Sequence, residues 1–306
     1  MTEVENNPSS SLIKDDEVDL NELFSVLWKE KIKIILITSI FAIGSVIYAL
    51  NLTNYYESSS ILVPRDNSEN QGILSQYSGV ASLVGVNISN SGNNNVMEVI
   101  ETIKSREFLK HLLTFEGILP SIVASKNYDK DTKQIVFNSE LYKKENNTWL
   151  KLKPSYIKAH ESYVDNLLSI SYEAKTGLVR IQIEHISPIF AKEFLDLIIK
   201  EINILKRNKE IESSSEALSY LKEKLLKTPL VEIKESINLL IQAQLEQQML
   251  AQVHDDFSLV IVDPPFIPEK KSKPSRAMIC ILITFIGGLI SLVYVLVNHY
   301  SLRKQN

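Results

Sequence analysis

Two long apolar segments, one toward each end of the sequence, constrain the fold of this chain more than any other feature. The first covers residues 32–52, in which Lys33 is the only charged side chain, and the second covers residues 277–297, which carry no charge. A helix of about 20 apolar residues spans the roughly 30 Å hydrocarbon core of a bilayer. Because helices buried in soluble proteins rarely stay apolar on every face, we predict two transmembrane helices rather than two core helices.

The positions of the basic residues indicate the orientation of the chain. Lys29, Lys31 and Lys33 lie at the start of the first segment, whereas the nearest basic residue after it is Arg65. Basic flanks stay in the cytoplasm, so both ends of the chain are expected there. The second segment opposes this rule, because four basic residues precede it and two follow it. The first segment is expected to be retained, since no A-x-A cleavage site follows it.

The two segments divide the chain into five expected parts. The domain between them is long enough to bury a substantial core. The net charge of −4 gives no indication of nucleic-acid binding. The expected parts are a cytoplasmic segment at 1–31, transmembrane helix 1 at 32–52, an extracytoplasmic α/β domain at 53–276, transmembrane helix 2 at 277–297 and a cytoplasmic tail at 298–306.

A strand hairpin followed by a long helix is the clearest pattern within the domain. Residues 168–172 and 178–184 are predicted strands, the second with strict alternation of apolar and polar side chains. Ser187 then provides a helix cap and Pro188 suits the first helical position. The next 39 residues contain neither proline nor glycine. We therefore predict one helix over residues 188–227, about 60 Å long, which projects beyond the domain.

The remaining elements of the domain are predicted from shorter patterns. Residues 231–253 resume helical spacing, with Ile237, Leu245 and Met249 among the periodic apolar positions, and would return the chain toward the membrane. The other predictions are strands at 55–64 and 257–263, a mobile loop at 66–95 and a helix at 96–115.

The sequence contains no pattern typical of an active site. It has neither G-x-x-x-x-G-K-[ST] nor G-x-S-x-G. The five histidines never occur four residues apart, and the single cysteine, Cys280, lies in the second apolar segment. The cluster His254-Asp255-Asp256 is better explained as a polar helix terminus, and a pair of carboxylates distant in sequence stays open. We expect no catalytic residue, cofactor or metal.

Four of the ten prolines lie just before the second apolar segment. Pro264, Pro265, Pro268 and Pro274 favour extended backbone. Residues 264–274 would span about 30 Å if fully extended. They are predicted to form a stiff strut that couples the domain to the membrane.

Four basic residues accompany these prolines. Lys270, Lys271, Lys273 and Arg276 are expected at the outer-leaflet headgroups. There they would contact anionic lipid or, alternatively, the pyrophosphate of a lipid-linked glycan.

Small residues recur at close-packing spacing in both apolar segments. The second segment has Gly287, Gly288 and Ser291, and the first has Ser45 and Ala49. Small side chains four residues apart let transmembrane helices approach closely. We therefore predict a helix–helix contact at these positions.

In this order, the features resemble the polysaccharide co-polymerases, the chain-length determinant (Wzz) proteins of Gram-negative envelopes. The resemblance lies in ASLVGVNI (81–88), SREFLKHL (105–112), KTGLVRIQIEHISPIFAKEFLDLIIKEIN (175–203) and VIVDPPFIPEKKSKP (260–274). It implies an α/β periplasmic domain with a long protruding α-helix, flanked by two transmembrane helices. It also implies that Pro264, Pro268 and Pro274 occupy the family's proline pattern.

The resemblance implies a function without catalysis. Copies would assemble into a ring in the inner membrane, with helix 188–227 facing neighbours or the lumen. The ring would set the chain length of a surface polysaccharide made by a membrane-embedded polymerase from lipid-linked repeat units. The tail has no kinase domain, which favours the lipopolysaccharide O-antigen or common-antigen type over capsule. The alternatives are a scaffold for polysaccharide export that reaches the outer membrane, and a membrane-anchored hydrolase.

Overall fold

A computed structural model describes residues 26–65 and 92–303 of the chain. The chain divides into two compact units, one formed by residues up to Leu52 and from Pro274 onward, the other by Thr53–Lys273. Most of the predicted cytoplasmic segment 1–31, the segment ASLVGVNI and most of the predicted loop 66–95 lie outside the described residues.

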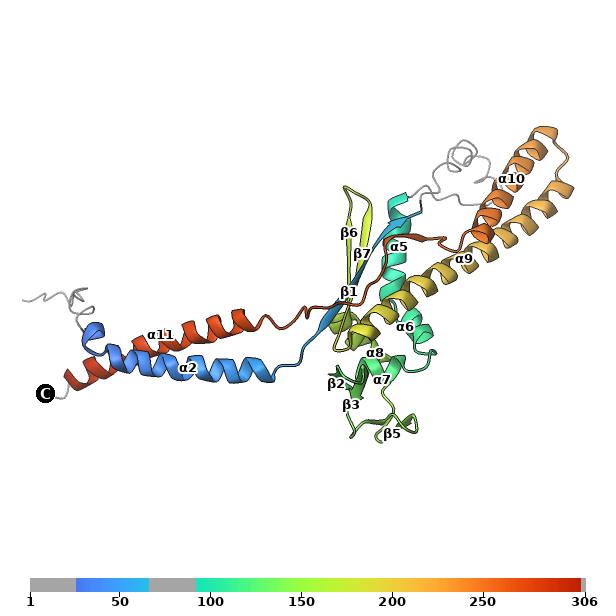
Figure 1. Cartoon of the computed structure of the whole chain (residues 1–306). Coiled ribbons are helices and arrows are strands. Elements are labelled where there is room, and N and C mark those ends of the chain that lie inside the picture. The colour runs from blue at the N-terminus through green and yellow to red at the C-terminus, as the bar shows by residue number, and fades with distance from the viewer. Residues whose placement is uncertain (1–25, 66–91, 304–306) are drawn as a thin grey trace, which may run out of the picture. The chain divides into compact units, whose positions relative to one another are not determined.

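The first unit consists of two long apolar helices that pack against each other. They are α2 (Lys31–Asn51) and α11 (Arg276–Arg303) (Figure 1). Both are long and apolar enough to cross a membrane. Their apolar side chains are largely exposed in the isolated chain. This is the arrangement expected when lipid, rather than protein, covers a helix surface.

The second unit is built on a four-stranded antiparallel sheet with the order β6-β7-β1-β8. Alternation determines its buried face, because Val179, Ile181 and Ile183 are fully buried along β7. Gly177 has φ +72° in the turn between β6 and β7, which glycine adopts without steric cost. The predicted hairpin is confirmed. The strands are β1 (Tyr56–Pro64), β6 (Leu168–Glu173), β7 (Leu178–His185) and β8 (Leu259–Asp263).

Helix α9 (Pro188–Lys227) is the predicted 40-residue helix. Its first turn is fixed by Ser187, whose Oγ accepts a hydrogen bond from the Phe190 backbone N–H at 3.2 Å. Pro188 occupies the first turn, where its missing N–H costs nothing. The fold class predicted from the sequence, a mixed α/β domain with a long helix between two apolar terminal helices, is confirmed.

The helix predicted at 96–115 is in fact two helices, α5 (Gly92–Lys104) and α6 (Arg106–Leu112). Ser105 separates them because its backbone is extended and its Oγ caps α6, accepting from the Phe108 N–H at 3.1 Å. Helical spacing of apolar residues continues across the break, which is why periodicity alone missed it. Both helices still contribute to the core.

The main hydrophobic core lies between the sheet, the first half of α9 and helices α5 and α6. Tyr163 is its largest fully buried side chain, and its hydroxyl donates to the Ile103 carbonyl at 3.2 Å. Burial raises the pKa of this phenol. Other fully buried members are Leu62, Phe108, Leu109, Leu112, Phe194, Leu195, Ile198 and Ile202.

A small lobe follows α6 along the chain and joins the sheet near the start of β1. The His185 ring, opposite Tyr56 in the β1–β7 register, contacts Ser121 of α7. The elements here are α7 (Ile118–Val123), β2 (Ser125–Asp129), β3 (Gln134–Phe137), β4 (Tyr142–Lys143), β5 (Thr148–Trp149), α8 (Tyr156–Ser162) and the π-helical turn η1 (Tyr163–Leu167).

Candidate functional site

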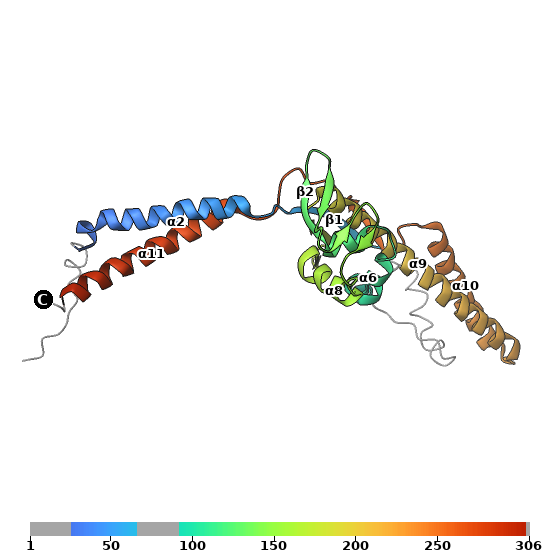
Figure 2. The ribbon, with the colours of Figure 1, turned by 90° about the horizontal axis from the view of Figure 1, so that it is seen from below.

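A helical hairpin formed by the second half of α9 and by α10 (Val231–Val253) extends away from the main core. Residues of α9 up to Ile202 belong to the main core, whereas Leu221 packs with Ile237 and Leu240 of α10 in a separate cluster. Figures 1 and 2 show the two helices side by side. The predicted projection of helix 188–227 beyond the sheet is therefore present in this unit.

The base of the hairpin is held to the sheet by Asn203 of α9. Its Oδ1 accepts from the backbone N–H groups of Ser258 at 2.8 Å and Leu259 at 2.9 Å. Its Nδ2 donates to the Leu259 carbonyl at 3.0 Å. The side chain is buried, so each of these groups would otherwise lack a partner in a region shielded from water. Asn203 could not be predicted from the sequence, because a lone asparagine in a helix forms no pattern.

Helix α10 also carries an exposed apolar stripe, which we call the α10 stripe: Leu245, Met249 and Val253. Leu245 is 42%, Met249 63% and Val253 75% exposed. A groove of about 580 Å³ runs along this stripe. Sequence periodicity grouped Leu245 and Met249 with Ile237, but only Ile237 is buried.

Helices α2 and α11 pack closely at Gly287. A Cβ atom built on Gly287 would lie 2.5 Å from the Cβ of Phe41, closer than real side chains approach. Ser291 is fully buried, donates to the Gly288 carbonyl at 2.7 Å and lies 3.5 Å from the Thr38 hydroxyl of α2. The structure thus brings two of the three predicted positions into the contact between these helices.

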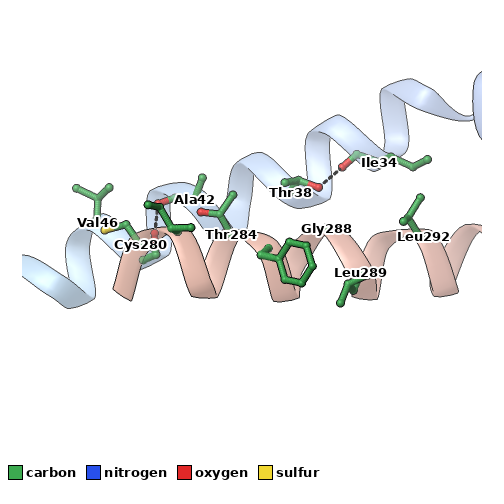
Figure 3. A pocket seen from close by; sticks show the side chains of 12 residues that line it. Ile34, Thr38, Ala42, Val46, Cys280, Thr284, Gly288, Leu289 and Leu292 are labelled. Carbon is green, nitrogen blue, oxygen red and sulfur yellow. Dashed lines mark hydrogen bonds between the residues drawn. The ribbon is translucent and has the colours of Figure 1, made fainter. Parts of the chain in front are cut away.

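Gly288 lies beside the contact rather than in it. A Cβ atom at Gly288 would meet nothing within 4 Å, because the residue lines an open groove between α2 and α11. The groove measures about 660 Å³ and is almost entirely apolar, with Cys280 and Thr284 among its few polarisable or polar side chains. Figure 3 shows Thr38 and Ala42 of α2 facing Thr284 and Gly288 of α11.

The proline-rich segment does not form a free strut. It runs along β1, where Ser60 Oγ donates to the Asp263 carbonyl at 2.6 Å and Ser58 Oγ donates to the Phe266 carbonyl at 2.7 Å. The Tyr55 N–H donates to the Lys273 carbonyl at 2.9 Å. Residues 263–273 therefore lie beside only seven residues of β1 and its approach, about 20 Å of strand.

This pairing explains how prolines can lie next to a strand. Proline has no N–H to donate but keeps its carbonyl, and the serine hydroxyls of β1 supply donors to carbonyls of the segment. Pro265 and Pro268 are buried, Pro274 is half-buried and Pro264 is exposed. The segment is fixed by docking on the domain rather than by proline stiffness.

The four basic residues predicted at the headgroups do not form one group. Lys273 Nζ pairs with Glu184 Oε2 at 2.6 Å, and this partner raises the pKa of Lys273. The Arg276 guanidinium donates to the Leu52 carbonyl at 3.3 Å, at the C-terminal end of α2, where a cation is favourable. Lys270 and Lys271 are exposed. Two of the four therefore have roles within the chain itself.

The buried ionisable groups have structural partners rather than a common centre. His185 Nδ1 accepts from the Ser187 N–H at 3.1 Å, so Nε2 carries the proton and donates to the Ser121 carbonyl at 3.0 Å. Burial lowers the pKa of His185 to about 4. Glu201 of α9 is buried and pairs with His111 at 2.7 Å.

Other charged groups lie where the hairpin meets the rest of the domain. The hydrogen bond from Lys206, at 2.7 Å, lowers the pKa of Glu98. Arg207 pairs with Asp255 at 2.7 Å, just after His254 at the end of α10. Within residues 26–65 and 92–303, no three or more His, Cys, Asp or Glu side chains gather in a way that could hold a metal ion.

Residues 16–115 match the family model described as "Wzz: Chain length determinant protein". Comparison with curated proteins finds no match. Among solved structures, the chain is similar to a full-length bacterial polysaccharide co-polymerase, with 14% identity, coverage of 94% of this chain and 99% of that chain, and a TM-score of 0.40. It is also similar to a fragment of WzzB, a polysaccharide co-polymerase from Salmonella Typhimurium, with 15% identity, coverage of 72% and 100%, and a TM-score of 0.30. The resemblance expected from the sequence is confirmed over residues 16–115, where this chain matches the chain-length determinant (Wzz) family.

Proposed function

We propose that this chain is a non-enzymatic inner-membrane regulator of the length of a surface polysaccharide, of the lipopolysaccharide O-antigen or common-antigen type. The match of residues 16–115 to the chain-length determinant family carries the proposal. In this role the chain catalyses no step itself. A separate membrane-embedded polymerase joins lipid-linked repeat units, and this chain limits how many are joined.

The two apolar terminal helices support an inner-membrane location with two membrane crossings. In the proposed topology both ends of the chain are cytoplasmic and residues 53–273 are periplasmic, as the basic residues Lys29, Lys31 and Lys33 favour. The domain would then share a compartment with the growing glycan. Cysteine accessibility at Ser213 in intact and permeabilised cells tests this topology, and a Ser213→Cys variant that reacts only after inner-membrane permeabilisation contradicts it.

The proposed working form is a ring of several copies. The α10 stripe supports it, because a continuous row of exposed apolar side chains on a helix is a typical contact surface between subunits. From Ser236 to Val253 the helix has a single charge, Glu246, so little charge has to be desolvated when a neighbour covers it. The hairpin of one copy would contact the hairpin of the next.

The function is tested with a deletion strain complemented by the full chain. We expect the surface polysaccharide to lose its modal length on deletion and to regain it on complementation, as read from the ladder on a gel. An unchanged ladder contradicts chain-length regulation. If the chain then copurifies with an outer-membrane exporter, the export scaffold replaces it.

The ring is tested separately with the variant Leu245→Asp/Met249→Asp. Charges on the stripe oppose burial against a neighbour, so the assembly should dissociate and the modal length should be lost. The control Asn166→Asp/Ser171→Asp adds the same charge at exposed positions outside the hairpin and should change neither. Mass measurement in detergent that shows intact assemblies for the stripe variant refutes this interface.

A further inference from the structure

Within the small lobe, residues 125–158 differ in charge from the rest of the chain; we call this part the basic lobe. It has eight lysines against two aspartates and two glutamates, a net +4, whereas the chain as a whole is −4. All eight lysines are exposed. The ion pair between Lys151 and Glu140 is long, at 3.7 Å, and exposed, so it neutralises little. The lobe is a positively charged surface on an acidic protein.

Large apolar side chains are exposed among these lysines. In the segment WLKLKPSYIK (149–158), Leu152 is 96% exposed and lies between Lys151 and Lys153. Single exposed apolar residues are ordinary, but four within ten positions are not. The other three are Leu150, Tyr156 and Ile157. Alternating lysines and exposed apolar side chains are typical of segments that lie at a membrane interface.

This exposure is not caused by a lack of local structure. Tyr142 packs against Phe137 and Trp149, with ring centroids 5.2 and 5.1 Å apart. The Leu150 N–H donates to the Leu141 carbonyl at 2.9 Å. The lobe therefore has its own aromatic centre, and Leu152 is held outside it.

The basic lobe is attached to the end of the sheet from which the chain runs into α2. His185, paired with Tyr56 in the sheet, donates to the carbonyl of Ser121 in α7, which leads directly into β2. Tyr56 is the first residue of β1 and comes five residues after Asn51, the last residue of α2. Lys273, where the chain leaves the domain again, is bonded to Tyr55 at this same end. The end of the sheet on which the lobe lies is therefore within a few residues of both apolar helices along the chain.

We propose that the basic lobe binds the anionic phospholipid surface of the membrane, with Leu152 inserted among the headgroups and Lys151 and Lys153 beside lipid phosphates. The inference rests on α2 and α11 spanning that membrane, but not on chain-length regulation. Lysine ammonium groups complement lipid phosphate, and the interaction should weaken with salt, because the Debye length is about 10 Å at 0.1 M and about 3 Å at 1 M. A second contact besides the two helices would fix the orientation of the domain on the membrane.

The test uses the full chain in nanodiscs made of phosphatidylcholine alone or mixed equally with phosphatidylglycerol. An environment-sensitive fluorophore is attached to Leu152→Cys in a Cys280→Ala background, and lipids carry a nitroxide quencher near the headgroup. The matched control carries the same fluorophore at Ser213→Cys, an exposed position on α9. Incorporation of the chain into the nanodiscs is measured independently, so failure of the helices to insert is distinguished from failure of the lobe to bind.

We expect quenching at position 152 to exceed that at 213 about threefold in phosphatidylglycerol nanodiscs, and to fall toward the control in phosphatidylcholine or at high salt. The reversal Lys151→Glu/Lys153→Glu should abolish the difference, while Lys222→Glu/Lys234→Glu on the hairpin should not. Equal quenching at 152 and 213 in both lipids overturns the proposal. So does salt-independent quenching in phosphatidylcholine, or a response to soluble dextran sulfate without one to lipid, which would assign the lobe to an anionic polymer.

Discussion

Replacing Asn203 with alanine should destabilise the domain more than any other single polar substitution in the hairpin. The change removes three hydrogen bonds at 2.8, 2.9 and 3.0 Å and leaves two N–H groups and one carbonyl of Ser258 and Leu259 without their partner. Each unsatisfied buried group costs about 1–3 kcal/mol. Some water will enter the space left by the amide, so we take the lower part of the range, about 3–5 kcal/mol in total.

A loss of this size is a large share of the 5–15 kcal/mol that holds a typical domain together. For a domain of this length, 1 kcal/mol corresponds to roughly 2–4 °C, so the unfolding midpoint should fall by about 10 °C. The unfolding midpoint can be followed by tryptophan fluorescence of the full chain in detergent, because Trp149 packs against the main core. A second probe is hydrogen exchange at the Leu259 amide, which should speed up well before global unfolding.

Two further variants separate the hydrogen bonds from the helix. Asn208→Ala changes an exposed asparagine on the same helix and should leave the midpoint within about 2 °C. Asn203→Asp keeps an acceptor for both N–H groups, but its ionised second oxygen repels the Leu259 carbonyl. At acid pH the protonated carboxyl can donate to that carbonyl, so the unfolding midpoint of this variant should then lie between those of wild type and Asn203→Ala. A midpoint for Asn203→Ala equal to that of Asn208→Ala refutes the assignment of Asn203 as the clamp.

Gly287→Val should separate α2 from α11 and reduce cysteine cross-linking between them, whereas Gly288→Val, whose added carbon meets nothing within 4 Å, should not; equal effects would refute the close contact. His185 has a pKa of about 4 in the folded chain against 6.5 in the unfolded chain. The neutral ring therefore contributes fully to the stability of the fold above pH 6.5, and this contribution is lost as the pH falls toward 4. The domain should lose about 2 kcal/mol between pH 7 and pH 5, and His185→Gln should flatten this part of the stability curve measured by urea unfolding; an equally steep curve would contradict it. Lys273→Ala should lower stability by about 1 kcal/mol at pH 7, because the Lys273 side chain is 69% exposed, while Glu184, 14% exposed, keeps the Ser272 hydroxyl at 3.2 Å as a partner; a much larger loss in the same urea assay would show that Glu184 depends on Lys273 alone.

Local patterns in the sequence predicted the elements that local physics determines. The turn at Gly177, the cap at Ser187 and the first-turn proline at Pro188 each depend on a few neighbouring residues. The sequence predicted the strands that became β1, β7 and β8, but not that β1 pairs with the other two. The order and register of the sheet depend on contacts between residues more than a hundred positions apart, which one sequence does not specify.

The errors arose where two elements compete for the same apolar residues. Met249 fits the helical period of α10 as well as Ile237 does, and only the position of α9 decides that Ile237 is buried and Met249 exposed. The contact at Gly287 was predicted from its small side chain, but the sequence did not identify Phe41 as its neighbour. Asn203 gave no signal at all, since its partners are backbone groups and backbone groups have no sequence signature.

The proline-rich segment shows how a correct composition can support a wrong mechanism. Prolines do make a free chain stiff and extended, and from this the sequence predicts a strut. In the structure the serines at 58 and 60 donate to carbonyls of the segment, and Tyr55 is bonded to Lys273. The chain therefore enters and leaves the domain at one hydrogen-bonded point. Leu52, Thr53 and Asn54 connect α2 to this point, and Pro274 and Ser275 connect it to α11. These linkers are short, so the point where the chain enters and leaves the domain stays within a few residues of α2 and α11 along the chain.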